Sequence, residues 1–144
     1  MIIRKMTEED IPAVVLVDES AFSKCWNGNM FCEELRKDYS DYFVAENDTG
    51  IIGYAGIWSI YETAELMRIA VMPGHRNKGI ARSLLEKITD CANENGCHRM
   101  MLEVRESNVP ARKLYESAGF KEISVRKGYY DGEDAVIMEA TFSL

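Results

Sequence analysis

The sequence predicts an α/β fold in which a mixed sheet carries helices on both faces. Three observations lead to it. Strand-like and helix-like segments follow one another in the order β-α-α-β-β-β-α-β-α-β-β. No internal repeat or Pro/Ser-rich linker divides the chain, so we expect one domain over residues 1–144. The hydrophobic fraction of 47% and charged fraction of 28% are ordinary for a globular protein.

The first half of the chain supplies three predicted strands and two helices. Residues 2–5 form a strand, and a capping pair of Thr7 and Asp10 then precedes a helix over residues 11–21. We expect Asn29 to cap a short helix that runs through Arg36. Residues 42–46 and 51–60 then form a hairpin around Asp48-Thr49-Gly50.

The second half begins with a strand over residues 64–72, which Pro73-Gly74 ends. Apolar residues then recur at helical spacing from Ile80 to Cys91, and Asn95-Gly96 stops that helix. Residues 99–105 alternate as a strand. Residues 109–117 form a helix with Pro110 in its first turn. Strands over residues 123–125 and 135–142 complete the order.

Charge and hydropathy exclude several classes of protein. The formal net charge of −7 argues against nucleic-acid binding, which needs a basic surface, and favours a cationic partner. No run of 18 apolar residues could form a transmembrane helix, so we expect no membrane partner. The first ten residues lack the basic-then-apolar order of a signal peptide. We therefore expect a cytoplasmic protein.

The four cysteines form no C-x-x-C pair. With only His75 and His98 beside them, we expect no metal site. Free and mostly buried thiols in a reducing compartment are the expectation.

A basic turn precedes the helix that begins near Ile80. His75, Arg76 and Lys78 lie in it, and Gly79 follows. The first N–H groups of a helix have no intrahelical partners and carry partial positive charge, so this turn is suited to an anion. Gly74 and Gly79 have P-loop spacing, but Ile80-Ala81 replaces the Lys-Ser/Thr that a triphosphate needs. A solvated basic turn remains the alternative.

Two motifs carry a resemblance to a known family. Arg76-x-x-Gly79-x-Ala81, preceded by Ile69-Ala70-Val71, resembles the acetyl-CoA motif of the GNAT N-acetyltransferases. The spacing N-x-x-A-x-x-L-Y-x-x-x-G-F, from Asn108 to Phe120, resembles the second signature of that family. The resemblance implies the GNAT fold, a mostly antiparallel mixed sheet splayed at the acetyl-CoA site.

The resemblance also implies which residues bind acetyl-CoA, the expected cosubstrate. The strand residues Ile69, Ala70 and Val71 would pair with the pantetheine arm, and an N–H near Val71 would polarise the thioester carbonyl. The pyrophosphate would lie on the backbone of the loop and first helical turn, beside Arg76. Those positions are Asn77, Lys78, Gly79, Ile80, Ala81 and Arg82. Asn108 joins this set, although it could serve only as a helix cap.

Acetyl transfer from a thioester to an amine needs two proton-transfer groups. The amine must be neutral to attack, and an α-amino group has a pKa near ~8, so a modest base suffices. A phenol can protonate the departing thiolate. Glu103 and Tyr115 supply a base and an acid at matching positions. The alternatives are a solvated strand face for Glu103 and core packing for Tyr115.

A closer resemblance is to the RimI-type branch, which acetylates the N-terminal alanine of a small-subunit ribosomal protein. It rests on Leu102-Glu103-Val104-Arg105 and on Arg126-x-x-Tyr129-Tyr130. The branch usually has P-W-S/T where this chain has Cys25-Trp26-Asn27, and often Asn where it has Arg68. We expect Trp26, Arg68, Tyr129 and Tyr130 to bind the acceptor. The three aromatic residues would form walls of its site, with ordinary packing as their alternative.

The expected partner is therefore a peptide or protein N-terminus, approached by a monomer or weak dimer. Two other functions remain open from the sequence. One is the same transfer to a small-molecule amine, and Arg68 would suit an acceptor that carries a carboxylate. The other is a non-catalytic acyl-CoA sensor, which would need neither Glu103 nor Tyr115.

Overall fold

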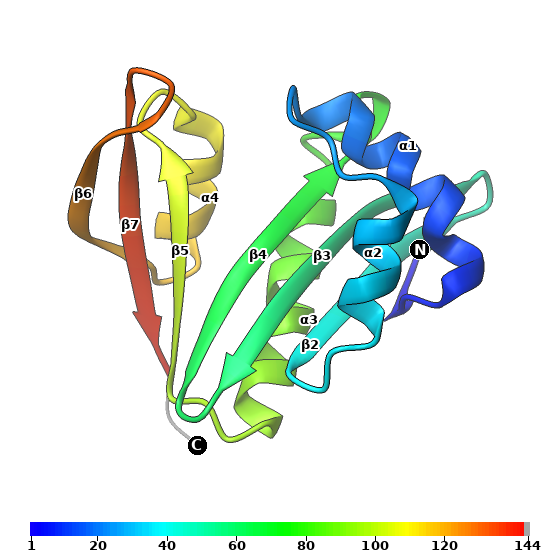
Figure 1. Ribbon diagram of the computed structural model, residues 1–144, viewed down its shortest axis with the longest axis horizontal. Coiled ribbons are helices and arrows are strands. Elements are labelled where there is room, and N and C mark those ends of the chain that lie inside the picture. Colours follow the sequence, from blue (N-terminus) through cyan, green and yellow to red (C-terminus); the bar gives the residue numbers. More distant parts are fainter. Residues whose placement is uncertain (143–144) are drawn as a thin grey trace.

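The computed structural model describes residues 1–142 and contains a seven-stranded sheet in the order β1-β2-β3-β4-β5-β7-β6 (Figure 1). Every neighbouring pair is antiparallel except β4 and β5, which are parallel. The expected mixed, mostly antiparallel sheet is confirmed. The strands are β1 (Ile2–Lys5), β2 (Ser40–Asn47), β3 (Gly50–Ile60), β4 (Thr63–Val71), β5 (Arg99–Arg105), β6 (Lys121–Tyr130) and β7 (Glu133–Thr141).

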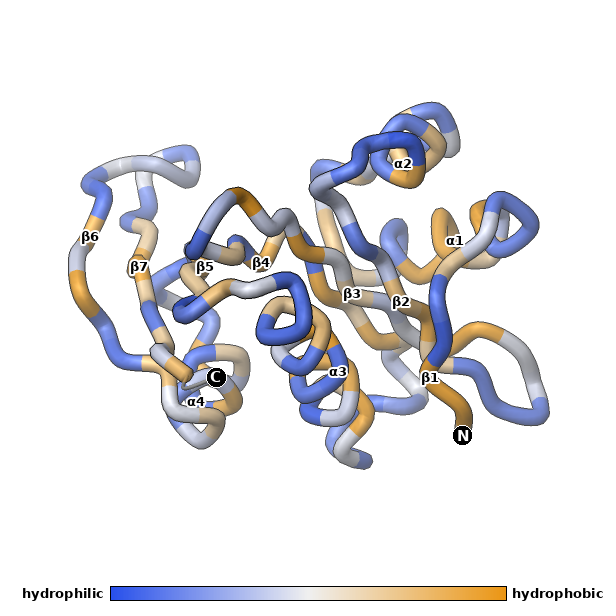
Figure 2. Tube along the Cα trace, turned by 90° about the horizontal axis from the view of Figure 1, so that it is seen from below, coloured by the Kyte–Doolittle hydropathy of each residue, from blue (hydrophilic) through white to orange (hydrophobic). Residues whose placement is uncertain are grey.

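Four α-helices cover the two faces of this sheet. They are α1 (Ile11–Ala21), α2 (Gly28–Leu35), α3 (Ile80–Glu94) and α4 (Val109–Ser117), and two 3-10 turns are η1 (Glu8–Asp10) and η2 (Pro73–His75). Helices α1 and α2 lie on one face, and α3 and α4 lie on the other (Figures 1 and 2). Helices therefore cover both faces, as the element order predicts.

Each face of the sheet has its own apolar core. Under α3, the side chains of Leu84, Leu85 and Ile88 pack with the inward residues of β5 and with Tyr115 and Phe120. Under α1 and α2, the buried residues are Met6, Val14, Val17, Phe31, Tyr42, Val44, Tyr54 and Ala70. The helical spacing of Leu84, Leu85 and Ile88 produces the stripe that faces the sheet.

Two of the predicted element boundaries are wrong. Asn27, not Asn29, caps α2, because its side chain accepts a hydrogen bond of 3.0 Å from the Met30 amide. Strand β6 runs over ten residues rather than over 123–125. The sequence pattern did not reveal its full length, because nine of its ten residues are exposed and show no alternation of burial. The thiols also differ from expectation: Cys97 is buried, Cys25 is exposed, and Cys32 and Cys91 are half-buried.

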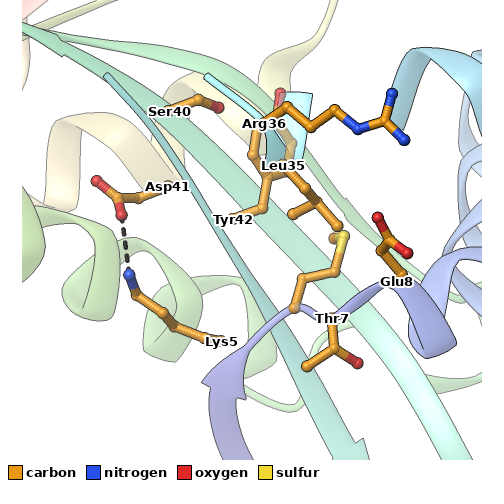
Figure 3. Close-up of a pocket in the computed structure, with 9 residues that line it drawn as sticks. Lys5, Thr7, Glu8, Leu35, Arg36, Ser40, Asp41 and Tyr42 are labelled. Atoms are coloured by element: carbon orange, nitrogen blue, oxygen red, sulfur yellow. Dashed lines mark hydrogen bonds and ion pairs between the residues drawn. The ribbon is translucent and has the colours of Figure 1, made fainter. Parts of the chain in front are cut away.

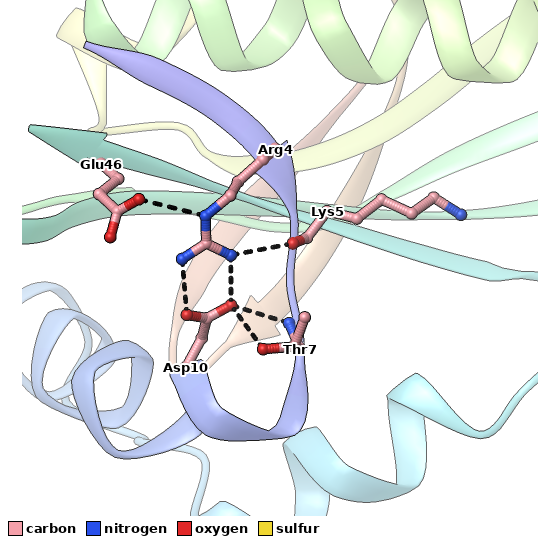
Figure 4. A network of polar contacts seen from close by, with 5 residues as sticks. All are labelled: Arg4, Lys5, Thr7, Asp10 and Glu46. Atoms are coloured by element: carbon pink, nitrogen blue, oxygen red, sulfur yellow. Dashed lines mark hydrogen bonds and ion pairs between the residues drawn. The ribbon is translucent and has the colours of Figure 1, made fainter.

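The N-terminal strand is fastened by a polar network (Figure 4). Arg4 binds both carboxylate oxygens of Asp10 at 2.8 and 2.9 Å and donates to Glu46 at 3.2 Å. Asp10 also accepts from the Thr7 amide at 2.8 Å, which is the predicted capping pair. This network holds β1 and η1 at the sheet edge remote from β5.

The parallel strands β4 and β5 pair only at one end. Their register covers Thr63↔Arg99 to Glu65↔Met101 and then stops, while β5 continues to Arg105. Figure 1 shows the two strands diverging from that end. The sheet is therefore open between β4 and the second half of β5.

An irregularity in β4 lies beside this opening. Gly56 pairs with Arg68 and Ile57 with Leu66, so Met67 is an extra residue without an opposite partner. Gly56 is required here, because a Cβ atom at this position would lie 2.1 Å from the Tyr42 ring. A bulge bends the strand that carries it, and this one lies two residues beyond Glu65, where the pairing with β5 ends.

No helix within residues 1–142 combines the length and the apolar character needed to cross a bilayer.

Candidate functional site

The loop from β4 to α3 presents a row of unused backbone donors. None of the N–H groups from Asn77 to Arg82 donates to an acceptor within residues 1–142, and the first helical bond runs from the Ser83 amide to the Gly79 carbonyl at 3.0 Å. Asn77 and Gly79 have φ values of 62° and 80°, and this left-handed backbone turns the loop into the helix. The arrangement is a site for an anion at the start of a 15-residue helix.

Two arginine side chains brace this loop. Arg76 donates from Nε to the Val71 carbonyl at 3.0 Å, which ties the loop to the end of β4. Arg82 donates to the Ser117 hydroxyl at 2.6 Å and to its carbonyl at 3.3 Å, which ties α3 to α4. The loop residues from Gly74 to Gly79 are otherwise mostly exposed. The donor row is therefore held in place on both sides and faces solvent.

Glu103 lies on the part of β5 that has no β4 partner. Its neighbours Leu102 and Val104 are buried in the core under α3, so alternation directs the Glu103 side chain to the opposite face of the sheet. The carboxylate accepts a hydrogen bond of 2.7 Å from Nη1 of Arg126 on β6. Strand β5 thus places the Glu103 carboxylate at the opening, on the face of the sheet that α1 and α2 cover.

Tyr115 approaches from the other face. It lies on α4, is buried in the core under α3, and packs at an angle against Phe120 with ring centroids 5.9 Å apart. Burial, and secondarily the charge of Tyr130, raises the pKa of Tyr115 above its ordinary value. The phenol therefore stays protonated at neutral pH.

A second carboxylate, Glu65, lies where the pairing of β4 and β5 ends. Glu65 pairs with Met101, and Glu103 lies two residues further along β5, on the same face of the sheet as Met101. Partial burial, followed by the negative charge of Glu103, raises the pKa of Glu65. Neither Glu65 nor Arg126 was singled out as a site residue by sequence reasoning. Arg126 belongs to the segment that resembles the RimI-type branch, whereas no pattern marked Glu65.

The aromatic residues expected at the acceptor site lie on two separate walls. Trp26 packs against Phe31 in the core under α2, with centroids 5.3 Å apart. Tyr129 and Tyr130 pack edge to face at the end of β6, with ring centroids 4.9 Å apart and ring planes at 78°. Arg126 lies 4.2 Å over Tyr129, and Arg105 lies 4.4 Å over Tyr130. Tyr130 and Tyr129 are therefore beside Glu103, whereas Trp26 forms part of the opposite wall.

An ion pair joins the two walls. Lys24, in the segment between α1 and α2, pairs with Asp131 of the β6–β7 turn at 3.2 Å. The face of the sheet that carries Glu103 lies between these segments.

Two further expected site residues have structural partners. Asn108 caps α4 by accepting from the Ala111 amide at 3.3 Å, so its predicted alternative role as a cap is present. Arg68 is paired with Asp18 at 2.8 Å and is largely buried. An arginine so paired is not available as an isolated cation for a substrate carboxylate.

Two surface hollows lie elsewhere, beside β1 and β2. One, with a volume of about 310 Å³, is lined by residues that include Lys5, Glu8, Arg36 and Tyr42 (Figure 3). The other, of equal volume, lies between β1 and α3. Neither includes a residue from the β4–β5 opening, the donor loop or α4. The opening, which carries the titratable groups, is the better candidate for a reaction site.

A family model for the acetyltransferase (GNAT) family matches residues 5–120. The chain belongs to this family. A relative from Bacillus subtilis (strain 168) is 36% identical over 98% of this chain and 95% of its own. The ribosomal protein bS18-alanine N-acetyltransferase of Escherichia coli (strain K12) is 33% identical over 99% of this chain and 98% of its own.

The fold of the chain agrees with this family. The crystal structure of the ribosomal-protein-S18-alanine N-acetyltransferase from Escherichia coli superposes with a TM-score of 0.91, at 32% identity, over 99% of this chain and 94% of that one. The GNAT fold and the RimI-type resemblance are thereby confirmed. The chain is an acetyl-CoA-dependent N-acetyltransferase.

Proposed function

We propose that this enzyme acetylates the N-terminal α-amino group of a protein, an alanine-first N-terminus like that of ribosomal protein bS18. The observation that carries the proposal is the Glu103 carboxylate on the part of β5 without a β4 partner, together with the buried Tyr115 phenol in the core on the opposite face. The name of the Escherichia coli relative, which covers nearly the whole chain, supports the acceptor.

The donor side of the reaction fits the loop before α3. GNAT enzymes take their acetyl group from acetyl-CoA, whose diphosphate needs several hydrogen-bond donors. The unpaired N–H groups from Asn77 to Arg82 supply them without any side chain. The edge of β4 from Ile69 to Val71 has no β5 partner and is free to pair with the pantetheine arm.

Glu103 serves as the general base. The attacking amine must lose one proton as its nitrogen bonds to the carbonyl carbon of the thioester, and the Glu103 carboxylate accepts that proton directly or through a water. Its side chain lies on the α1 and α2 face, the side on which the two acceptor walls stand. The base and the acceptor thus share one side of the sheet.

Tyr115 serves as the general acid. When the tetrahedral intermediate breaks its C–S bond, the electron pair goes to sulfur and the thiolate takes the phenolic proton. Burial keeps that proton on the phenol until it is needed. The transfer is direct, so no acyl-enzyme forms and no side chain acts as a nucleophile.

The acceptor enters between the segment after α1 and the β6–β7 hairpin. Trp26 lines one side, and Tyr129 and Tyr130 line the other. An extended peptide N-terminus suits a gap with walls of this kind, because its backbone is narrow and its first side chain can be small.

Steady-state assays on two panels of acceptors test the proposal. One panel contains short peptides that differ in their first residue, and the other contains polyamines, amino sugars and free amino acids. We expect the highest kcat/KM on an alanine-first peptide. Turnover of small amines alone would contradict the peptide acceptor and leave the GNAT chemistry intact. Binding of acetyl-CoA without turnover of any amine would indicate an acyl-CoA sensor.

A further inference from the structure

Arg68 makes an unusually complete set of contacts for a residue beside a reaction site. From the middle of β4, its Nε donates to Oδ1 of Asp18 at 2.8 Å and its Nη2 donates to Oδ2 of the same carboxylate at 3.1 Å. Nη2 also donates to the Lys24 carbonyl at 2.9 Å. One guanidinium therefore binds α1 and the segment that follows it, 50 and 44 residues away in sequence.

The same guanidinium lies against two aromatic rings of that segment. It is 3.9 Å from the centroid of Phe22 and 4.7 Å from that of Trp26. A planar guanidinium can stack on aromatic rings while its edge makes hydrogen bonds, and a lysine ammonium cannot do both. Residues 22–26, which we term the acceptor segment, are thus held by Arg68 at Phe22, Lys24 and Trp26.

Asp18 completes the attachment. Its carboxylate is fully buried and accepts from the Trp26 amide at 2.7 Å, as well as from the Tyr54 hydroxyl. The Arg68 side chain is 14% exposed, so the two charges compensate each other in a largely dry environment. Burial, and then the hydrogen bond to Asp18, raises the pKa of Tyr54, which keeps its proton on the hydroxyl.

The acceptor segment has no regular secondary structure of its own, since α1 ends at Ala21 and α2 begins at Gly28. Irregular backbone between two helices is held by whatever side chains reach it. Arg68 reaches this segment from the sheet: it donates a hydrogen bond to the segment's backbone and stacks on its two aromatic rings. The segment is also the wall that meets the β6–β7 turn through Lys24 and Asp131.

We propose that Arg68 is a positioning residue for the protein acceptor: paired with Asp18, it fixes the acceptor segment over the β4–β5 opening and so sets the affinity for the peptide N-terminus. This inference rests on the proposed peptide acceptor. It replaces the idea that Arg68 binds a substrate carboxylate, because the charge of Arg68 is already committed to Asp18. Within residues 1–142, no side chain of this network donates a hydrogen bond to the donor loop, which is braced instead by the contact of Arg76 with the Val71 carbonyl.

Steady-state kinetics of Arg68→Asn and Arg68→Lys test the proposal. We expect the KM for an alanine-first peptide to rise about tenfold or more in both variants, because a displaced wall misplaces the acceptor. The KM for acetyl-CoA should stay within about twofold, as the donor site is separate. Lysine restores the charge next to Asp18 but not the two-oxygen contact or the stacking, so it should not rescue the peptide KM.

Tyr54→Phe is the matched control. It removes one hydrogen bond from the same Asp18 carboxylate and leaves every contact of Arg68 with the acceptor segment in place. We expect it to lower the melting temperature without raising the peptide KM. Amide hydrogen exchange should accelerate at residues 22–26 in the Arg68 variants and not in Tyr54→Phe.

Three outcomes would overturn the proposal. They are an unchanged peptide KM in a folded Arg68 variant, a full rescue by lysine, or an equal rise of the peptide KM in Tyr54→Phe. If Arg68→Asn does not fold, Arg68→Lys carries the test. These outcomes differ from failure of the proposed function, in which the wild-type enzyme itself would acetylate no peptide.

Discussion

Arg126 donates a 2.7 Å hydrogen bond to the carboxylate of Glu103 and joins β6 to β5 beside the opening of the sheet. The same guanidinium lies 4.2 Å over the Tyr129 ring. Glu103 therefore already has a cation as its partner on the face that an acceptor amine would approach. We expect an arriving ammonium group to compete with Arg126 for this carboxylate.

Replacing Arg126 tests this competition. In Arg126→Gln we expect the KM for a peptide acceptor to fall by less than about tenfold, because exposed ion pairs are weak. The difference from wild type should shrink at high salt. Lys127→Gln is the control, since Lys127 lies on the same strand and pairs with Asp134 at 3.3 Å instead. A higher peptide KM in Arg126→Gln would mean that Arg126 assists acceptor binding rather than opposing it.

Tyr115 gives a prediction for the alkaline side of the pH profile. Its raised pKa means that the protonated phenol is retained above the ordinary titration range of tyrosine, near ~10. We expect wild-type kcat to rise as the amine loses its proton and then to stay level up to about pH 10. Tyr115→Phe should lower kcat about a hundredfold at every pH. An alkaline decline of kcat near pH 8 that disappears in Tyr115→Phe would contradict a buried, protonated acid.

Gly79 gives a prediction for the donor site. Its φ of 80° is costly for an alanine, by roughly 1–2 kcal/mol, although a Cβ atom there would meet nothing within 4 Å. Gly79→Ala should therefore turn the donor row away and weaken binding of CoA about tenfold in titration calorimetry. Gly74→Ala is the control, because Gly74 also has open space but no left-handed backbone. Equal binding by the two variants would remove Gly79 from the diphosphate site.

Glu65 gives a prediction for stability. A carboxyl whose pKa is raised in the folded protein binds its proton more tightly there, so its ionisation at neutral pH disfavours the folded state. Glu65→Gln should raise the melting temperature by about 1–3 °C at pH 7.5 and by less as the pH falls toward 4. Glu62→Gln, in the neighbouring turn, is the control for loss of a negative charge. An increase for Glu65→Gln that persists in full at pH 4 would rule out this linkage.

Much of the fold could be predicted because its elements carry strong periodic patterns. The apolar residues of α3 recur every three to four positions, and β5 alternates cleanly, so both elements were predicted closely. Strand β6 could not be bounded, since an exposed edge strand has no buried face to produce alternation. The cap of α2 was misplaced because Asn27 and Asn29 are both good capping residues, and tertiary contacts choose between them.

The sequence predicts which residues belong to the candidate site better than it predicts the contacts those residues make. Glu103 and Tyr115 are site predictions from motif spacing, and the structure directs the Glu103 side chain to the α1 and α2 face and buries Tyr115 in the core under α3. The pairing of Arg68 with Asp18 spans 50 residues and leaves no local pattern in the sequence. The same holds for the contact of Arg126 with Glu103, which depends on the order of β5, β7 and β6 in the sheet.

One measurement tests the central claim most directly: the rate at which wild type and Glu103→Gln acetylate an alanine-first peptide from pH 6 to about 9.5. Tandem mass spectrometry of the product identifies the nitrogen that is modified. We predict acetylation of the α-amine, a loss of about 10²–10⁴ in kcat for the variant near pH 7, and a much smaller loss where the amine is already neutral. Equal rates for the two enzymes across this range, or acetylation of a lysine side chain instead, would contradict it.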